Sequence, residues 1–275
     1  MWRRFLRNRR ALIGGMIVLA LYLVALLAPL LVPHDPNQQV LLDRLNGPSA
    51  EHLFGTDSLG RDILSRAIYG ARVSLAVSLV ATLITIVIGA LVGLVSGYVG
   101  GWLDNLMMRV TDVFLAFPIF ILLITVVAIY GSSMFLLILF LGLAAWPSTA
   151  RLVRAEVLSL AGREFVLAAR VGGARDLRIM LVHLLPNLVP ILVVAATLRV
   201  GIVILVEAGL SYFGLGVSPP TPTWGNMVAD GRIYLDSAWW ITTFPGVLIV
   251  VTVLVYNLLG DGLRDVFDPR RLARA

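Results

Sequence analysis

The chain has 275 residues and a formal net charge of +6; 59% of its residues are apolar and 14% are charged. Soluble domains carry about 25% charged residues, so this composition excludes an ordinary soluble protein and indicates an integral membrane protein. The sequence contains no lysine and no cysteine, which excludes a lysine-containing P-loop, thiolate metal sites and disulfides.

These absences predict that the chain is not an enzyme. Any nucleotide hydrolysis must come from a partner, because the chain lacks the lysine of a P-loop. The three histidines, His34, His52 and His183, are far apart in the sequence and are too scattered to predict a metal cluster. We therefore expect no bound cofactor, no metal and no catalytic residue in this chain.

Six apolar stretches are long enough to cross a hydrocarbon core of about 30 Å, which takes about 20 helical residues. They predict an all-α integral membrane protein with six transmembrane helices, at residues 11–32, 73–99, 113–130, 134–150, 188–206 and 241–259. The other predicted parts are a basic N-terminus (1–10), an outer segment (33–72), an inner connection (151–187) within the core domain (73–260), and a C-terminal tail (261–275).

The arginines predict the orientation of these spans. The first ten residues hold five arginines, and the apolar run that follows, 22 residues long, exceeds the core of about 7–15 residues found in a cleaved signal. With the N-terminus inside, 16 arginines fall in inner segments and five in outer ones, and Arg199 lies within a span. Positive charge accumulates on the cytoplasmic side, so both termini are predicted to be cytoplasmic.

The outer segment contains one pattern typical of a helix start. Asp57 or Ser58 can cap a helix that begins near Leu59, and Arg66 follows Asp62 at helical spacing. The pattern predicts a short helix lying on the membrane surface. On composition alone, a solvated connector is the simpler interpretation.

Small residues and prolines recur inside the predicted spans. Gly89, Gly93 and Gly97 lie on one face of the second span, where another helix can approach closely. Four prolines, each able to permit a kink, lie in or at the ends of spans: Pro118, Pro147, Pro190 and Pro245.

Two ionisable residues lie in or near the fifth span. Arg199 is costly at mid-membrane and is expected to face the protein interior or a wet cavity. Glu207 is two turns further on, too far for a direct contact within one helix. A structural pairing and a place along a substrate path both remain open. The loop that begins there, 207–227, is rich in glycine and proline and is predicted to be irregular.

The inner connection carries six arginines between Arg151 and Arg178, and its helical pattern is interrupted at Gly172-Gly173 by a turn of the kind that ends helices. A short helix is predicted from Ala174 to about His183, with an apolar stripe of Ala174, Leu177 and Leu181 on one face. Such a stripe fits either a groove on a partner protein or a layer of lipid headgroups.

One motif in this connection has the spacing of a known loop signature: Ala168, Ala169, Gly173 and His183-Leu184-Leu185-Pro186. It resembles the cytoplasmic loop of permease subunits in binding-protein-dependent ABC importers. That resemblance implies a coupling helix–turn–helix between the fourth and fifth spans. Leu167 stands where the general signature has Glu, which affects one side-chain contact. His183 stands where many members have Ile, and this departure resembles the peptide-importer branch.

Motifs elsewhere in the chain are similar to the C-type subunit of dipeptide and oligopeptide permeases. They occur in the order of that subunit, at 54–57, 60–62, 65–66, 69–75, 214–216, 219–222, 224–227, 257–265 and 268–270. The resemblance implies a bacterial or archaeal inner (plasma) membrane protein that forms half of a translocation pathway for di- or oligopeptides, driven by ATP hydrolysis in partner subunits. Its implied partners are a B-type permease subunit, two ATPase subunits holding ATP and Mg²⁺, an extracytoplasmic peptide-binding protein and membrane lipid, without nucleic acid.

The resemblance also implies two sets of site residues. Coupling to the ATPase is expected at Ala168, Ala169, Gly173, Ala174, Arg175, Asp176, Leu177 and Arg178. A pathway or outer gate is expected at Arg199, Glu207, Phe213, Trp224 and Asn226. Nickel chelates and glutathione-like peptides are alternative substrates. A lone ion-coupled transporter, using Arg199 and Glu207 as a relay, and a passive assembly protein are alternative functions.

Overall fold

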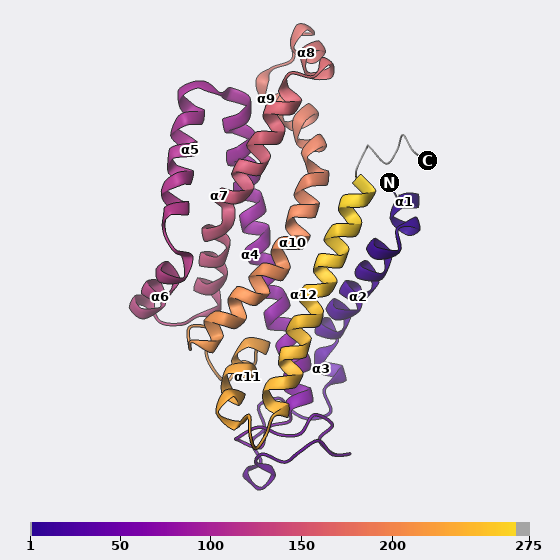
Figure 1. Cartoon of the computed structure of the whole chain (residues 1–275), viewed down its shortest axis with the longest axis vertical. Coiled ribbons are helices and arrows are strands. Elements are labelled where there is room, and N and C mark those ends of the chain that lie inside the picture. Colours follow the sequence, from indigo (N-terminus) through magenta and orange to yellow (C-terminus); the bar gives the residue numbers. More distant parts are fainter. Residues whose placement is uncertain (1, 268–275) are drawn as a thin grey trace.

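The structure, a computed structural model, describes residues 2–267 and shows a bundle of long helices (Figure 1). The helices are α1 (Trp2–Arg7), α2 (Arg9–Leu26), α3 (Ala28–Leu31), α4 (Ile63–Val99), α5 (Gly101–Ala116), α6 (Ile119–Tyr130), α7 (Met134–Ala161), α8 (Glu164–Val171), α9 (Asp176–Arg178), α10 (Leu185–Tyr212), α11 (Trp224–Gly231) and α12 (Trp240–Phe267). Five helices in the described part are long and apolar enough to span a membrane, or six if one bent pair counts as a span. The predicted all-α membrane architecture is confirmed.

The bounds of the long helices differ from those of the apolar stretches that predicted them. The first predicted span, 11–32, contains α2, which begins at Arg9, where Asn8 caps its first turn, and ends at Leu26, before α3. The last helix reaches Phe267, so the tail predicted from residue 261 starts as helix, and residues 268–275 lie outside the described part. A hydropathy pattern locates only the apolar middle of a helix. The polar turns at the ends of the helix are also helical, but they contribute no apolar residues to the pattern.

The third predicted span, 113–130, is not one helix. It is divided between α5 and α6, and the two axes meet at 75°. The break lies at Phe117, which is extended, and Pro118, which precedes α6. Proline has no N–H to donate to the preceding turn and disfavours helical geometry in the residue before it, so the kink expected at Pro118 becomes a complete interruption.

The glycine face predicted in the second span is where α4 packs on α7. A β-carbon at Gly89 would lie 2.5 Å from the Thr149 side chain, and one at Gly93 would lie 2.4 Å from the Ala150 carbonyl. At Gly97 the nearest obstacle would be Val157. The glycines therefore bring the two backbones together, as small residues do between membrane helices.

The helix predicted at 174–183 and the fifth span form one continuous helical segment, 176–212. Its first half contains a π-helical turn, Ile179–Leu184, immediately before Pro186. Since proline cannot donate a backbone bond, the register changes here, and Asn187 Nδ2 donates to the His183 carbonyl at 2.6 Å. The His-Leu-Leu-Pro motif is thus the point at which the inner connection becomes a span.

The surface helix predicted near Leu59 is absent from the structure. Asp57 instead accepts backbone bonds from Leu59 and Arg61 across a turn in which Gly60 has a φ of +71°. The helix begins at Ile63, where Asp62 accepts a bond from the Ser65 N–H, and runs directly into the second span. The prediction that Asp57 caps the helix was therefore wrong. Asp57 closes a turn, and Asp62 is the residue that caps α4.

The two ends of the bundle differ in what they contain. Helix α1 and the last turns of α12 lie toward the same end as α8, whereas α11 and the segment 33–62 lie at the opposite end (Figure 1). We call these the α8 end and the α11 end. Within the loop predicted to be irregular, helix continues to Tyr212 and resumes at Trp224, so only its middle part is irregular.

Candidate coupling turn and outer-end sites

The turn at the α8 end is closed by backbone hydrogen bonds. The Gly172 N–H donates to the Ala168 carbonyl (2.9 Å), and the Ala174 N–H donates to the Ala169 carbonyl (3.0 Å). Gly173 has a φ of +77°, the left-handed conformation in which helices commonly end at glycine. The two alanines and the glycine of the motif therefore form one turn, and the predicted helix–turn–helix is confirmed.

A buried apolar cluster holds this turn against the bundle. Val166 of α8 and Ile179 of the π-helical turn are fully buried together with Val153 and Val157 of α7, and Ala174 packs against them. Burying aliphatic side chains of this size contributes about 1.5–3 kcal/mol each. The turn is therefore attached to α7 and α10 and is expected to move with them.

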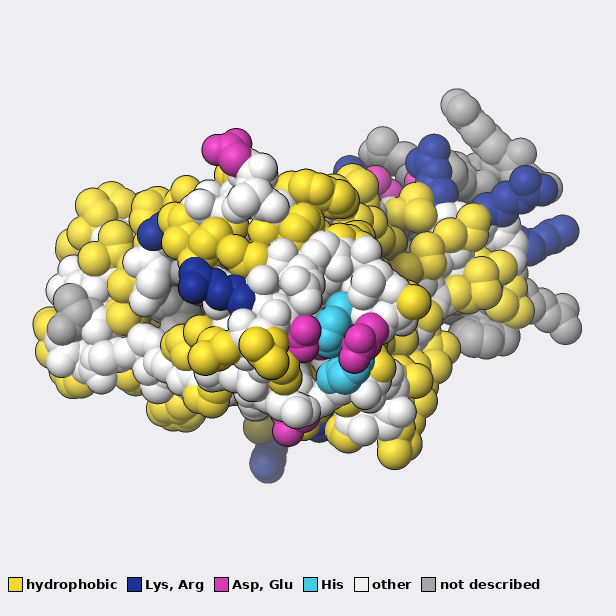
Figure 2. Space-filling model, turned by 90° about the horizontal axis from the view of Figure 1, so that it is seen from below, with side chains coloured by type: hydrophobic (Ala, Val, Ile, Leu, Met, Phe, Trp, Pro, Cys, Tyr) yellow, Lys and Arg dark blue, Asp and Glu magenta, His cyan; other side chains and the backbone are white. Residues whose placement is uncertain are grey.

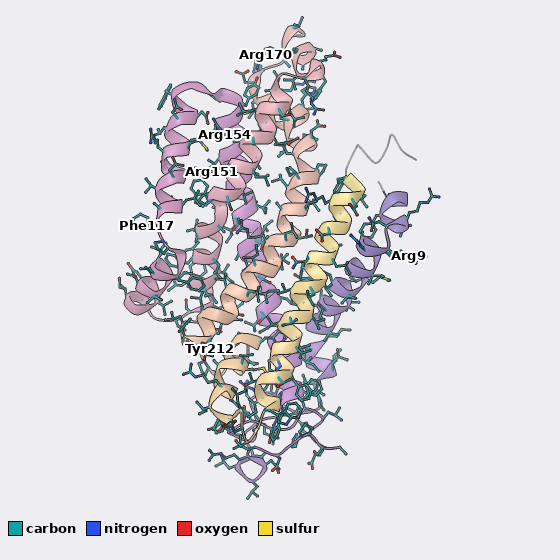
Figure 3. The ribbon with its side chains drawn as sticks, in the orientation of Figure 1. Arg9, Phe117, Arg151, Arg154, Arg170 and Tyr212 are labelled. Carbon is teal, nitrogen blue, oxygen red and sulfur yellow. The ribbon has the colours of Figure 1, made fainter. Side chains whose placement is uncertain are left out.

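Tyr98 joins the turn to the end of α4. Its hydroxyl donates to Asp176 Oδ1 at 2.6 Å, and Arg170 lies with its guanidinium carbon 5.7 Å from the tyrosine ring centroid. The bond between Arg170 and the Tyr98 hydroxyl raises the pKa of the guanidinium, which stays charged. Arg170 lies at this end in Figure 3. Sequence reasoning missed Tyr98, because no local signal connects it with a loop far along the chain.

Arg151 and Arg154, the first two arginines of the inner connection, hold α5 against α7. Arg154 donates from Nε and from its terminal nitrogen to both carboxylate oxygens of Asp104, each at 2.6 Å, and Arg151 pairs with Asp112. Both arginines lie on α7 facing α5 (Figure 3). Bidentate pairing of this kind is directional as well as strong, so these arginines are structural ties between helices.

Other side chains of the turn point outward. Val171 is 90% exposed and Leu177 is 63% exposed, and Arg175 and Arg178 are exposed beside them. The expected coupling residues thus lie at one end of the molecule, with apolar tips flanked by cations. Of the predicted apolar stripe, Ala174 packs inward, whereas Leu177 and Leu181 are exposed.

At the α11 end, the outer-gate candidates occupy different positions. Phe213 is 69% exposed and lines a hollow of about 640 Å³ together with Asn226 and Arg232. Asn226 also forms a reciprocal cap with Thr223 at the start of α11. Part of its side chain is therefore committed to holding the helix.

Trp224 is in the core. It is 1% exposed, its indole N–H donates to the Ala67 carbonyl at 2.9 Å, and its backbone N–H donates to Ser74 Oγ. The side chain joins α11 to α4. The side chain is therefore not itself part of the exposed surface at this end, and its expected role in a pathway or outer gate stays a prediction.

Arg199 and Glu207 are not paired with each other. The Arg199 guanidinium donates to Ser148 Oγ at 2.5 Å, across to α7. Glu207 is 1% exposed and accepts a bond from Ser211 Oγ at 2.9 Å. Each residue is thus bonded to a separate serine, and no hydrogen bond between these two described residues links them into the relay that a lone ion-coupled transporter would use.

The segment 33–62 contains a network of charged side chains. Arg61 Nε donates to Asp57 Oδ2 at 2.6 Å, Arg66 lies 3.6 Å from the same oxygen, and Arg61 lies 3.8 Å from Asp230 of α11. Partial burial raises the pKa of the Asp230 carboxyl, against the opposing effect of Arg61 and Arg66. The network attaches the segment 33–62 to the start of α4 and to α11.

The histidines correct one expectation drawn from the sequence. The spacing of His34 and His52 predicts no cluster, yet their ring centroids lie 4.8 Å apart. His52 Nδ1 is 2.9 Å from Asp62 Oδ1. The fold places both histidines beside Asp62, at the start of α4. The spacing of His34 and His52 in the sequence does not predict this proximity.

The chain matches two family models. Residues 85–272 match "Binding-protein-dependent transport system inner membrane component". Residues 1–48 match "N-terminal TM domain of oligopeptide transport permease C". The first match includes every residue expected to couple to the ATPase, and the second includes the first predicted span.

Curated relatives align over almost the whole chain. A glutathione transport system permease protein, GsiD, of Salmonella typhimurium is 48% identical over 270 residues, which is 98% of this chain and 89% of the relative. A dipeptide transport system permease protein, DppC, of Alkalihalophilus pseudofirmus is 42% identical over 269 residues, or 98% and 88%.

A solved structure shares the fold. A chain of the MetNI methionine ABC transporter, in an inward-facing conformation, superposes with a TM-score of 0.60 at 24% identity and covers 75% of this chain and 97% of its own. At this level of identity the likeness concerns the architecture of the helices alone.

Proposed function

The chain belongs to the family of binding-protein-dependent transport system inner membrane components, and from that premise we propose that it forms half of the translocation pathway of an importer for short peptides. The permeases for glutathione and for dipeptides are both close in sequence. Their substrates are short chains of amide-linked residues. Short peptides are therefore the substrate class we assign, and longer peptides and nickel chelates are alternatives for the test below.

The proposed mechanism divides the work between subunits. Partner ATPases bind ATP and Mg²⁺ and hydrolyse the nucleotide, a second permease subunit supplies the other half of the pathway, and an extracytoplasmic binding protein delivers the peptide. The nucleotide and its Mg²⁺ are thus assigned to the partner ATPases and not to this chain. Its own contribution is mechanical, since the turn between α8 and α9 is packed onto α7 and α10 and transmits movement of an ATPase to the spans.

The main support for the coupling role is the exposed surface of that turn, which combines apolar and positively charged side chains. Val171 and Leu177 present apolar side chains, and Arg175 and Arg178 lie beside them. An exposed apolar site rimmed by charge fits a groove in a protein partner. We assign the α8 end, and with it α1 and the end of α12, to the cytoplasmic side of the plasma membrane, in agreement with the excess of arginine at this end.

Cross-linking tests the docking surface. Because the chain has no native cysteine, Leu177→Cys is expected to cross-link to a single cysteine introduced in the groove of a co-expressed ATPase subunit. Leu42→Cys is the matched control, since Leu42 is 95% exposed and lies in the segment at the opposite end. Equal cross-linking by both variants, or none by Leu177→Cys in an active complex, would contradict the assignment.

Stimulation of ATP hydrolysis tests the substrate. In a reconstituted complex, the binding protein loaded with a dipeptide or with glutathione is expected to stimulate hydrolysis several-fold over the unloaded protein. A longer peptide and a nickel chelate are compared at matched concentrations. Stimulation by the nickel chelate alone would retain the architecture and overturn the substrate. Uptake that follows an ion gradient without ATP would instead indicate a lone secondary transporter.

A further inference from the structure

Two histidines and one aspartate converge at the α11 end. His34 follows the first span, His52 lies in the outer segment, and Asp62 caps α4. One potential ligand atom from each residue lies within 4.8 Å of those of the other two. Figure 2 views this end from below and shows histidine side chains beside acidic ones at the centre of the surface.

One atom in this cluster lacks the bond that its burial requires. His34 Nδ1 is buried and has no hydrogen-bond partner among the described residues, and its nearest charged neighbour is Asp62 Oδ1, at 3.9 Å. A buried nitrogen without a partner costs about 1–3 kcal/mol. The atom faces the one carboxylate that also contacts His52, so a single ligand placed between the three groups would satisfy it.

The backbone around the cluster is already fixed. The His34 N–H donates to Ser65 Oγ, and the His52 N–H donates to Ser49 Oγ. The second oxygen of Asp62 accepts the Ser65 N–H at 2.7 Å, which orients the carboxylate and leaves Oδ1 directed at the histidines. Hydrogen bonds of this kind hold ligands in place around protein metal sites.

We propose that His34, His52 and Asp62 bind a divalent transition metal ion of the Zn²⁺ type, with water completing the coordination. Imidazole nitrogen and carboxylate oxygen are normal zinc ligands, with bonds of about 2.0–2.2 Å, and a tetrahedral arrangement places ligand atoms about 3.3 Å apart. The distances from Asp62 Oδ1 to the Nδ1 atoms, 2.9 Å to His52 and 3.9 Å to His34, lie on either side of that value. Because the three ligand atoms lie within 4.8 Å of one another, binding requires side-chain rotations that bring them closer to that spacing.

The role of the ion is structural. It ties together the end of the first span, the outer segment and the first turn of α4, which are held otherwise by the bonds described above. Cross-linking points that are separated along the chain restricts the unfolded state, and metal binding to the folded form alone adds stability. The outer segment is therefore expected to be more stable with the ion than without it.

The test uses the full-length chain, purified without a histidine tag, and Zn²⁺ as the probe. Isothermal titration is expected to give about one ion per chain, and Co²⁺ in its place is expected to give the visible absorption of a tetrahedral nitrogen–oxygen site. His34→Gln and His52→Gln are each expected to lower the affinity at least about 100-fold, since even outer-shell changes typically cost 10–100-fold. Zn²⁺ is expected to raise the unfolding temperature of the unmodified chain but not that of His34→Gln or His52→Gln.

The remaining histidine supplies the matched control. His183 lies in the π-helical turn at the other end, so His183→Gln is expected to bind Zn²⁺ as the unmodified chain does. Asp62→Asn keeps a side-chain oxygen that can cap α4 but removes the carboxylate. Weaker Zn²⁺ binding by this variant would therefore reflect the lost ligand and not an unfolded start of α4. Unchanged affinity in both His34→Gln and His52→Gln, or no binding by a folded chain at micromolar Zn²⁺, would overturn the proposal.

Discussion

Gly173→Val is expected to reduce ATP-driven uptake at least about tenfold while the amount of chain in the membrane stays the same. Gly173 has a φ of +77°, and a residue with a β-carbon pays about 1–2 kcal/mol in that region, with valine being a poor choice because it is β-branched. The turn relieves the strain by changing shape. The apolar tips on either side of it then no longer face the same partner.

The measurement compares uptake with ATP hydrolysis in the assembled complex. Hydrolysis that continues without uptake would locate the defect in coupling, as expected. Gly162→Val is the matched control, because Gly162 lies at the same end with a φ of −88° and a β-carbon added there would meet no other atom within 4 Å. Normal uptake by Gly173→Val would show that the coupling turn lies elsewhere.

Trp224→Ala is expected to destabilise the folded chain by about 3–5 kcal/mol, the usual cost of removing a buried tryptophan. The indole is 1% exposed and donates to the Ala67 carbonyl, so the substitution leaves a cavity between α11 and α4 and removes a hydrogen bond. Thermal unfolding in detergent is expected to shift down by about 6–20 °C, given a shift of about 2–4 °C per kcal/mol for large domains.

Trp239→Ala separates this effect from a general need for tryptophan at the α11 end. The Trp239 side chain is 50% exposed, and surface substitutions usually change stability by about 0.5 kcal/mol or less. Its unfolding temperature is expected to stay within about 2 °C of the unmodified chain. Equal shifts in the two variants would contradict the assignment of Trp224 to the core.

Local patterns predicted much of the fold. Long apolar runs required membrane helices, because backbone groups in hydrocarbon must bond within their own segment. The glycines at 89, 93 and 97 predicted a close helix contact, and the pair Gly172-Gly173 predicted the turn. These features depend on residues within a few positions of one another, so they can be recognised without knowing which helix lies opposite.

Other features needed the whole structure. The sequence offered Asp57 as a helix cap, and only the surrounding contacts show that it closes a turn and pairs with Arg61 instead. The bond between Tyr98 and Asp176 and the burial of Trp224 join residues far apart in sequence.

Composition and apolar run length suffice to predict a helical membrane protein, and local motifs suffice to predict the turn at Gly172-Gly173 and to show the resemblance to permeases, since these are properties of neighbouring residues. The meeting of His34 and His52 at Asp62, and the bonding of Arg199 and Glu207 to separate serines, follow only from the folded arrangement. Side-chain partners depend on how helices cross. The angle at which two helices cross is set by the packing of many residues at once, so a single local sequence pattern does not predict it.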